Sequence, residues 1–199
     1  MKLGILFFTI STIFFFNGCK NAEQGEPRLF SLENSEQQAF VNFLSSFCGQ
    51  GFRGRQTYIS PGRESWANKA MVIRFRECND GKMAIAFLLG GDESRTWLLL
   101  DEDGRLRFRH DHRNCDGTPE EVTLYGGYAI ELGSRKKQIF PADEYTCQML
   151  PNACNAEWQL ELTENSTLLS YSLFGHGKLL FKAEFDLSKP LNPLKQAAK

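Results

Sequence analysis

The sequence predicts a mainly β protein whose strands form an antiparallel barrel behind one N-terminal helix. Three observations support this prediction. From residue 52 onward, apolar and polar residues alternate with a period of two, as in strands that bury one face. Short turn sequences rich in Gly, Asn and Asp separate these alternating runs. Only residues 35–48 place their apolar residues at helical intervals.

The predicted helix carries its own start and stop signals. Ser35 and Gln38 have the spacing of a capping box, and Gly49 is a typical residue just past a helix end. Phe40 and Leu44 belong to one apolar face. We expect this face to pack on the sheet rather than on a partner.

The predicted strands follow one another with short connections. The connection at 79–81 is Asn-Asp-Gly, a strong hairpin signal because these residues tolerate positive φ. Roughly eight to ten short antiparallel strands favour a calycin-like barrel, because closure removes exposed sheet edges; a jelly roll is the second choice. The alternating segments that could supply these strands number eleven: 52–59, 71–76, 83–89, 95–100, 105–112, 122–125, 128–132, 137–140, 158–163, 167–174 and 179–187.

The N-terminus has the layout of an export signal. Residues 1–18 combine Lys2 with an apolar run that is too short for a permanent membrane span. The segment FNGC resembles a lipobox, in which Cys19 would be acylated, although Phe16 and Asn17 replace the usual Leu and Ala or Ser. An ordinary signal that is cleaved elsewhere is the alternative.

This layout predicts a domain organisation and a location. We expect a lipoprotein signal peptide at 1–18, a lipid-anchored tether at 19–30, a helix-plus-barrel domain at 31–190 and a flexible tail at 191–199. The lipid on Cys19 would hold the domain on a membrane of the bacterial cell envelope, the outer membrane being the first choice. The net charge of −1, without a basic stripe, argues against nucleic acid as a partner. We expect a monomer without a cofactor.

An exported chain is expected to form disulfides. Cys147 and Cys154 flank a short loop, and Cys48 and Cys78 could tie the helix to an early strand. Cys115 is then left over. Spacing alone does not determine the connectivity.

The predicted strand 105–112 contains the candidate site. Strand geometry places Leu106, Phe108, His110 and His112 on one face, which we expect to point into the barrel. The opposite face, with Arg105, Arg107, Arg109, Asp111 and Arg113, is expected to form a solvated stripe that pairs with acidic residues of a neighbouring strand.

Three interpretations of the two histidines remain open. They could be polar anchors of a ligand cavity, together with Arg95, Trp97 and Phe108. They could be catalytic or metal-ligating, with Asp116 or His176 as the third group, or with His112 and Asp116 as an acid–base pair. They could also be structural residues that hold the following loop.

The leading function hypothesis is the binding of a small molecule, including an apolar one, in the barrel. The enzyme that uses His110, His112 and Asp116 is the alternative, and a cell-envelope interaction module with an exposed apolar patch is the third. Alternation cannot separate core from cavity among the large apolar residues that are candidates for both: Phe52, Phe75, Phe87, Trp97, Phe108 and Trp158.

Several segments resemble one family of secreted bacterial proteins and lipoproteins of uncharacterised activity. Its members share an HDHRxxDGxxxxVTxYGG segment, matched here at residues 110–127, and a CGxxFxGR start, matched at residues 48–55. The likeness covers about residues 48–187 and favours a Cys48–Cys78 pair. It implies no established activity. Asn114 and Cys115 stand where members tend to have His and Glu, which removes two potential metal ligands.

Overall fold

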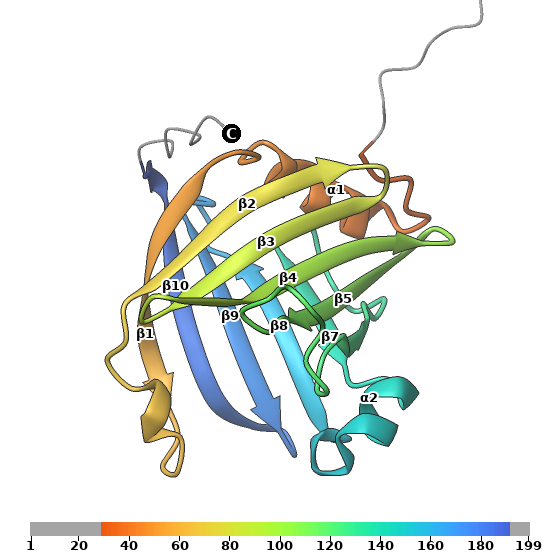
Figure 1. The fold of residues 1–199 in the computed structure, drawn as a ribbon. Helices are drawn as coiled ribbons and strands as arrows, with labels where there is room; N and C mark the ends of the chain where they lie inside the picture. Colours follow the sequence, from red (N-terminus) through yellow and green to blue (C-terminus); the bar gives the residue numbers. More distant parts are fainter. Residues whose placement is uncertain (1–28, 192–199) are drawn as a thin grey trace, which may run out of the picture.

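Residues 29–191, the part of the chain that the computed structural model describes, form a ten-stranded antiparallel sheet that curls into a nearly closed barrel (Figure 1). The spatial order is β6-β5-β4-β3-β2-β1-β10-β9-β8-β7. The predicted fold class, a mainly β antiparallel barrel of the calycin-like kind, is confirmed. The strands are β1 (Gly51–Ile59), β2 (Met71–Asn79), β3 (Lys82–Leu89), β4 (Asp92–Glu102), β5 (Arg105–His112), β6 (Tyr125–Tyr128), β7 (Lys137–Pro141), β8 (Ala156–Leu162), β9 (Leu168–Gly175) and β10 (Lys178–Pro190).

The gap between β6 and β7 is bridged by a few backbone hydrogen bonds. The Ile130 amide donates to the Ile139 carbonyl over 3.0 Å, and the Asp143 amide donates to the Gly126 carbonyl over 3.0 Å. A Cβ at Gly127 would overlap the carbonyl oxygen of Pro141. Glycine is therefore needed here because two backbones approach each other closely.

The helix α1 (Ser35–Ser45) lies at the upper end of the barrel in Figure 1. Its N-cap is Asn34 rather than the predicted Ser35, because the Asn34 side chain accepts from the amides of Glu36 (2.9 Å) and Gln37 (3.1 Å). The predicted apolar face is buried, with Phe40 and Leu44 at 0% exposure. This face fills one end of the barrel.

The segment between β5 and β8 differs most from the prediction. Two strands were expected at 122–125 and 128–132, but a single short strand, β6, forms there. Leu124 ends any preceding strand because it adopts a positive φ of 58°. A second helix, α2 (Glu144–Met149), was not predicted, and two 3-10 turns flank the barrel at η1 (Glu64–Trp66) and η2 (Pro151–Ala153).

The middle of the barrel is filled by aromatic side chains. Trp97 stacks on Phe87 with centroids 4.9 Å apart, and on Tyr171 with centroids 4.6 Å apart. All three residues are buried. The barrel is therefore not hollow from end to end.

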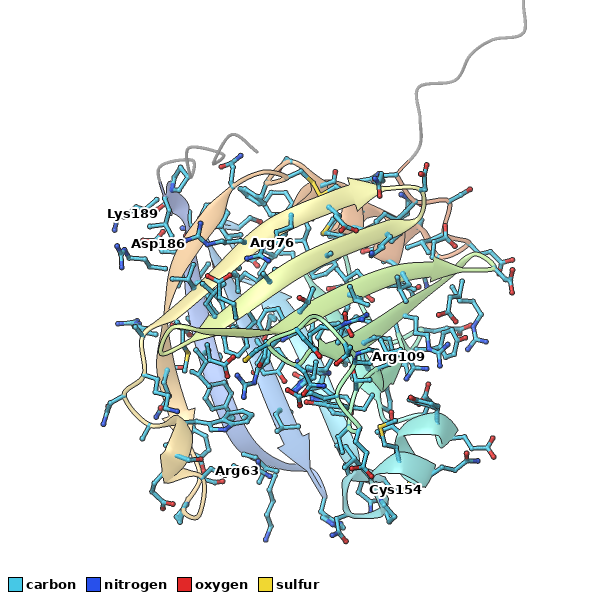
Figure 2. All side chains as sticks on the ribbon, viewed as in Figure 1. Arg63, Arg76, Arg109, Cys154, Asp186 and Lys189 are labelled. Carbon is cyan, nitrogen blue, oxygen red and sulfur yellow. A yellow bond between two sulfur atoms is a disulfide. The ribbon has the colours of Figure 1, made fainter. Side chains whose placement is uncertain are left out.

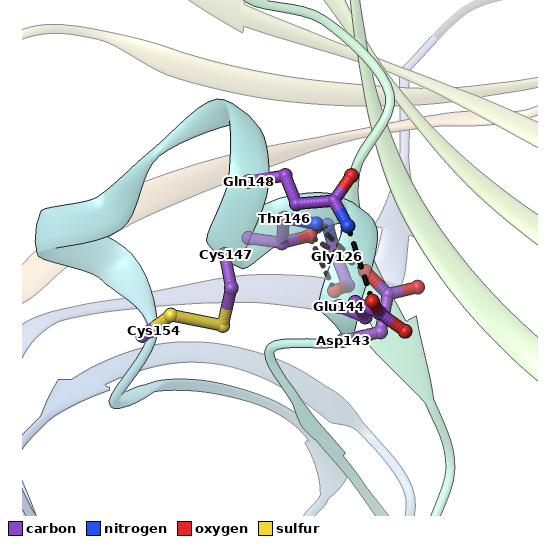
Figure 3. The surroundings of a disulfide bond; sticks show 7 residues. All are labelled: Gly126, Asp143, Glu144, Thr146, Cys147, Gln148 and Cys154. Atoms are coloured by element: carbon purple, nitrogen blue, oxygen red, sulfur yellow. Dashed lines mark hydrogen bonds between the residues drawn. A yellow bond between two sulfur atoms is a disulfide. The ribbon is translucent and has the colours of Figure 1, made fainter.

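Two disulfides join described residues, and both are pairs that the sequence suggested. Cys48–Cys78 links the end of the α1 segment to β2, and Cys147–Cys154 closes the α2–η2 segment (Figure 3). Cys115 is exposed and free within the described part of the chain. In residues 29–191 no helix is long and apolar enough to cross a membrane.

The predicted signal peptide, Cys19 and the tether up to residue 28 lie outside the described residues, as does the tail from residue 192. Phe30, which the prediction placed at the end of the tether, is 2% exposed and packs in the core. The described fold thus begins before residue 31.

Candidate functional site

A cavity of about 410 Å³ opens at the end of the barrel opposite α1. Its walls are aromatic and aliphatic side chains from distant parts of the chain, and its rim is polar. The aromatic lining residues are Trp66, Tyr125, Trp158, Tyr171 and Phe174; the polar ones are Arg63, Asn152, Asn155 and His176.

Strand periodicity positions the floor of this cavity. Trp158 and Leu160 on β8 alternate with outward residues, and Leu160 pairs with Tyr171 on β9. Trp158 and Tyr171 consequently both face inward, and they are 3% and 4% exposed. Trp97 stacks directly against Tyr171, so the cavity ends at Tyr171.

His110 supports this floor from below. It is 4% exposed, and its Nδ1 donates to the carbonyl oxygen of Tyr125 over 3.3 Å. Because a carbonyl only accepts, Nδ1 carries the proton, and Nε2 accepts from the Tyr171 hydroxyl over 3.0 Å. Burial lowers the pKa of His110 to about 3. The imidazole is therefore neutral near pH 7, and both of its nitrogens are occupied.

His112 lies at the end of the same face and is partly accessible. Its Nε2 is 3.1 Å from the Tyr125 hydroxyl, and its Nδ1 is 3.7 Å from the Glu120 carboxylate. Burial lowers the pKa of His112, and the positive charge of Arg95 lowers it further, against the opposing effect of nearby carboxylates. Burial also raises the pKa of Tyr125 to about 12. Tyr125, which lines the cavity, is thus a protonated donor to a neutral histidine.

The third group of the predicted catalytic or metal set is not brought to the two histidines. Asp116 lies in an exposed loop, where its carboxylate accepts from the Thr118 amide (2.9 Å) and hydroxyl (2.6 Å). His176 is at the cavity rim, on the turn between β9 and β10. Among residues 29–191, no group of three or more His, Cys, Asp or Glu side chains could hold a metal ion. The carboxylate that reaches His112 is Glu120.

The other predicted ligand residues lie behind or beside the cavity. Trp97 and Phe108 are core residues at 1% and 0% exposure, and Arg95 pairs with Asp92 next to His112. His110 and His112 contact the lining residues Tyr125 and Tyr171 without lining the cavity themselves. Of the large apolar candidates, only Trp158 lines it.

The arginine face of β5 is the expected solvated stripe only in part: Arg105 and Arg113 are exposed, Arg107 and Asp111 are half-buried, and Arg109 is buried. Arg109 is 5% exposed and binds the Asp143 carboxylate over 2.7 Å, while Arg107 binds Asp143 over 2.8 Å and Glu102 over 2.6 Å. The prediction was wrong at Arg109, because the α2 segment folds over the middle of this face and carries Asp143 onto it. The expected acidic partner on a neighbouring strand does exist, as Glu102 of β4.

Hydrogen bonds among Gly126, Asp143 and Thr146 also attach α2 to the barrel (Figure 3). Asp143 caps α2 by accepting from the Thr146 amide over 3.0 Å. The buried Thr146 hydroxyl accepts from the Gly126 amide (2.7 Å) and donates to its carbonyl (2.8 Å). Leu150 and Asn152, which follow directly, line the cavity. The position of this wall therefore depends on Asp143 and on the Cys147–Cys154 disulfide.

Sequence reasoning missed Arg63, Trp66, Glu120 and Tyr171 as site residues. Tyr171 carried one usable signal, its inward position in an alternating strand, but Arg63 and Trp66 lie in an irregular connection without periodicity. No protein-family model matches the chain, and no curated protein matches its sequence. The family resemblance stays a prediction.

Proposed function

We propose that this barrel binds a small molecule with an aromatic or apolar body in the cavity at its open end. The observation that carries the proposal is the aromatic lining of a space of about 410 Å³. Ligand cavities are typically roughly 300–1,000 Å³, apolar, and equipped with a few polar groups. Burial of about 200 Å² of apolar ligand surface there would contribute roughly 5 kcal/mol before the costs of association.

The lining is preorganised, which favours binding over a random surface hollow. The hydrogen bonds from Tyr171 and to the Tyr125 carbonyl orient His110, and the His110 ring stacks on Tyr125 with centroids 4.6 Å apart. Trp66 packs edge-on against the buried Phe181 at 5.2 Å. Aromatic walls that are already held in place lose little entropy when a ligand arrives.

A cavity-filling substitution tests this proposal. Leu173 lines the cavity and is only half-buried, so Leu173→Trp should fill the space with little disturbance of the core. The matched control is Leu132→Trp, because Leu132 is 86% exposed on the outer surface. The neutral fluorophore N-phenyl-1-naphthylamine serves as the probe. We expect the wild type and Leu132→Trp to enhance its fluorescence equally and Leu173→Trp to abolish the enhancement; equal binding by all three would refute the proposal.

A second candidate function rests on the Tyr125–His112–Glu120 array. The hydroxyl of Tyr125 lies 3.1 Å from the neutral imidazole of His112, which lies 3.7 Å from the carboxylate of Glu120. Groups in this order can relay a proton. We favour binding because the raised pKa of Tyr125 makes its hydroxyl a donor rather than a base. Chemical change of a cavity-bound compound by the wild type, lost in His112→Gln with binding retained, would establish the enzyme instead.

We further propose that Cys19 is acylated and holds the barrel on the cell envelope. The lipobox-like FNGC and the two disulfides, which suit an oxidising compartment, support this location. The expressed full chain should fractionate with membranes and shift in mass by the attached lipid, and Cys19→Ala should do neither. Membrane association of Cys19→Ala equal to that of the wild type would exclude the anchor.

A further inference from the structure

Among the described residues that line the cavity, Arg63 at the rim is the one charged side chain. Arg63 lies in the connection between β1 and β2, and Figure 2 labels it at the lower, open end of the barrel. Among residues 29–191 its guanidinium has no ion pair and no side-chain hydrogen bond under 3.5 Å. None of the described residues that line the cavity is acidic. The guanidinium of Arg63 is therefore available to pair with an anionic group of a ligand that enters the cavity.

Arg63 differs in this respect from the other arginines near the site. Arg107 and Arg109 are already bound to Asp143, and Arg95 to Asp92. Arg63 is half-buried, and it lines the cavity together with the floor residues Trp158 and Tyr171. Burial raises the pKa of Tyr171 well above its usual range, and the positive charge of Arg63 slightly opposes this rise.

Resting on the binding function proposed above, we propose that the ligand is an amphipathic carboxylic acid whose apolar body enters the aromatic cavity and whose carboxylate binds Arg63 at the rim. A guanidinium binds a carboxylate through two parallel hydrogen bonds, and a partly desolvated site strengthens them. The side-chain amides of Asn152 and Asn155, on the same rim, are further donors for the second face of the carboxylate.

The size and composition of the cavity agree with this ligand class. Polar lining groups gather at the rim, on η2 and on the turn after β9, whereas the floor consists of Trp158 and Tyr171. A molecule with one charged end and one apolar end matches this division, and an ion without an apolar body would leave the floor unused. The wall opposite Arg63 repels no anion, because it carries no carboxylate among its described residues.

The test compares an acid with its neutral isostere on the purified full chain. Decanoic acid and 1-decanol are titrated against bound N-phenyl-1-naphthylamine at a pH where the acid is ionised. We expect the wild type to prefer the acid by about ten-fold or more. Arg63→Gln should remove this preference while its affinity for the neutral probe and for decanol is unchanged. The matched control is Arg53→Gln, since Arg53 is exposed on β1 and away from the cavity.

The outcomes separate the two proposals. Equal displacement by acid and alcohol in the wild type, or an unchanged preference in Arg63→Gln, would overturn the carboxylate assignment while probe binding keeps the cavity function. Failure of the neutral probe to bind, with no difference between the wild type and Leu173→Trp, would overturn the cavity function itself. An acid preference lost equally in Arg53→Gln would mean that general surface charge, and not Arg63, attracts the acid.

Discussion

Asp143→Ala should destabilise the protein far more than the loss of an ordinary surface carboxylate. Asp143 is the acidic partner of the buried Arg109 at 2.7 Å, with side chains 16% and 6% exposed. Removing one partner of a buried ion pair leaves an uncompensated charge and costs about 3 kcal/mol or more. The same carboxylate caps α2, and the loss of an N-cap costs about 1 kcal/mol. A total of about 4 kcal/mol is a large share of the roughly 5–15 kcal/mol typical of a domain.

Urea denaturation of Asp143→Ala and of a control variant measures the difference between their free energies of unfolding. The control is Glu184→Ala, whose partners Arg55 and Lys182 are 77% and 31% exposed, so its free energy of unfolding should fall by less than about 1 kcal/mol. The double variant Asp143→Ala/Arg109→Met should recover much of the loss, because no buried charge is then left unpaired. Arg107 keeps Glu102 as its partner in both variants.

The same substitution connects stability to function. Without its cap and its ion pairs, α2 should open locally, and the cavity wall formed by Leu150 and Asn152 should move with it. We expect faster amide exchange in α2 and weaker probe binding under conditions where the barrel remains folded. A loss of stability in Asp143→Ala no greater than in Glu184→Ala, or a double variant as unstable as the single one, would refute this account of the pair.

Three further predictions concern titration, cross-links and barrel closure. The pKa of His110 in the folded state is lowered from 6.5 to about 3, so only the unfolded state takes up a proton at this residue as the pH falls below 6.5. The free energy of unfolding should then decline by up to about 1.4 kcal/mol per pH unit, or by about 2 kcal/mol at pH 5. His110→Gln should remove this dependence in urea titrations at several pH values. Cys48–Cys78 joins residues 30 positions apart and Cys147–Cys154 joins residues 7 positions apart. Loss of the first should therefore cost about 1 kcal/mol more than loss of the second, as measured for the two Cys→Ser double variants. The reverse order would contradict the loop-entropy argument. Gly127→Ala should lower the thermal midpoint by several degrees, because its Cβ would overlap the Pro141 carbonyl, whereas the exposed Gly117→Ala should cost about 1 kcal/mol or less through its positive φ alone.

Much of the barrel could be predicted because residues only a few positions apart determine where a strand forms and where it turns. β2 and β3 and the hairpin between them follow from alternation and from Asn-Asp-Gly, and Asp80 and Gly81 do adopt positive φ values of 46° and 73°. The inward position of His110 follows from the same period of two. The helix α2 escaped prediction because six residues are too few for helical periodicity to be read.

The sequence by itself determined the fold class, the strand faces, the turns and a buried His110, because each depends on neighbours a few residues apart. Only the tertiary structure decided where the cavity lies and what lines it. Barrel closure brings Arg63, Tyr125, Trp158 and Tyr171 to one opening from separate elements, and it buries Arg109 under α2. These arrangements follow from strand order and from contacts between residues more than thirty positions apart, such as the pairing of Arg109 with Asp143, and no local pattern records such contacts.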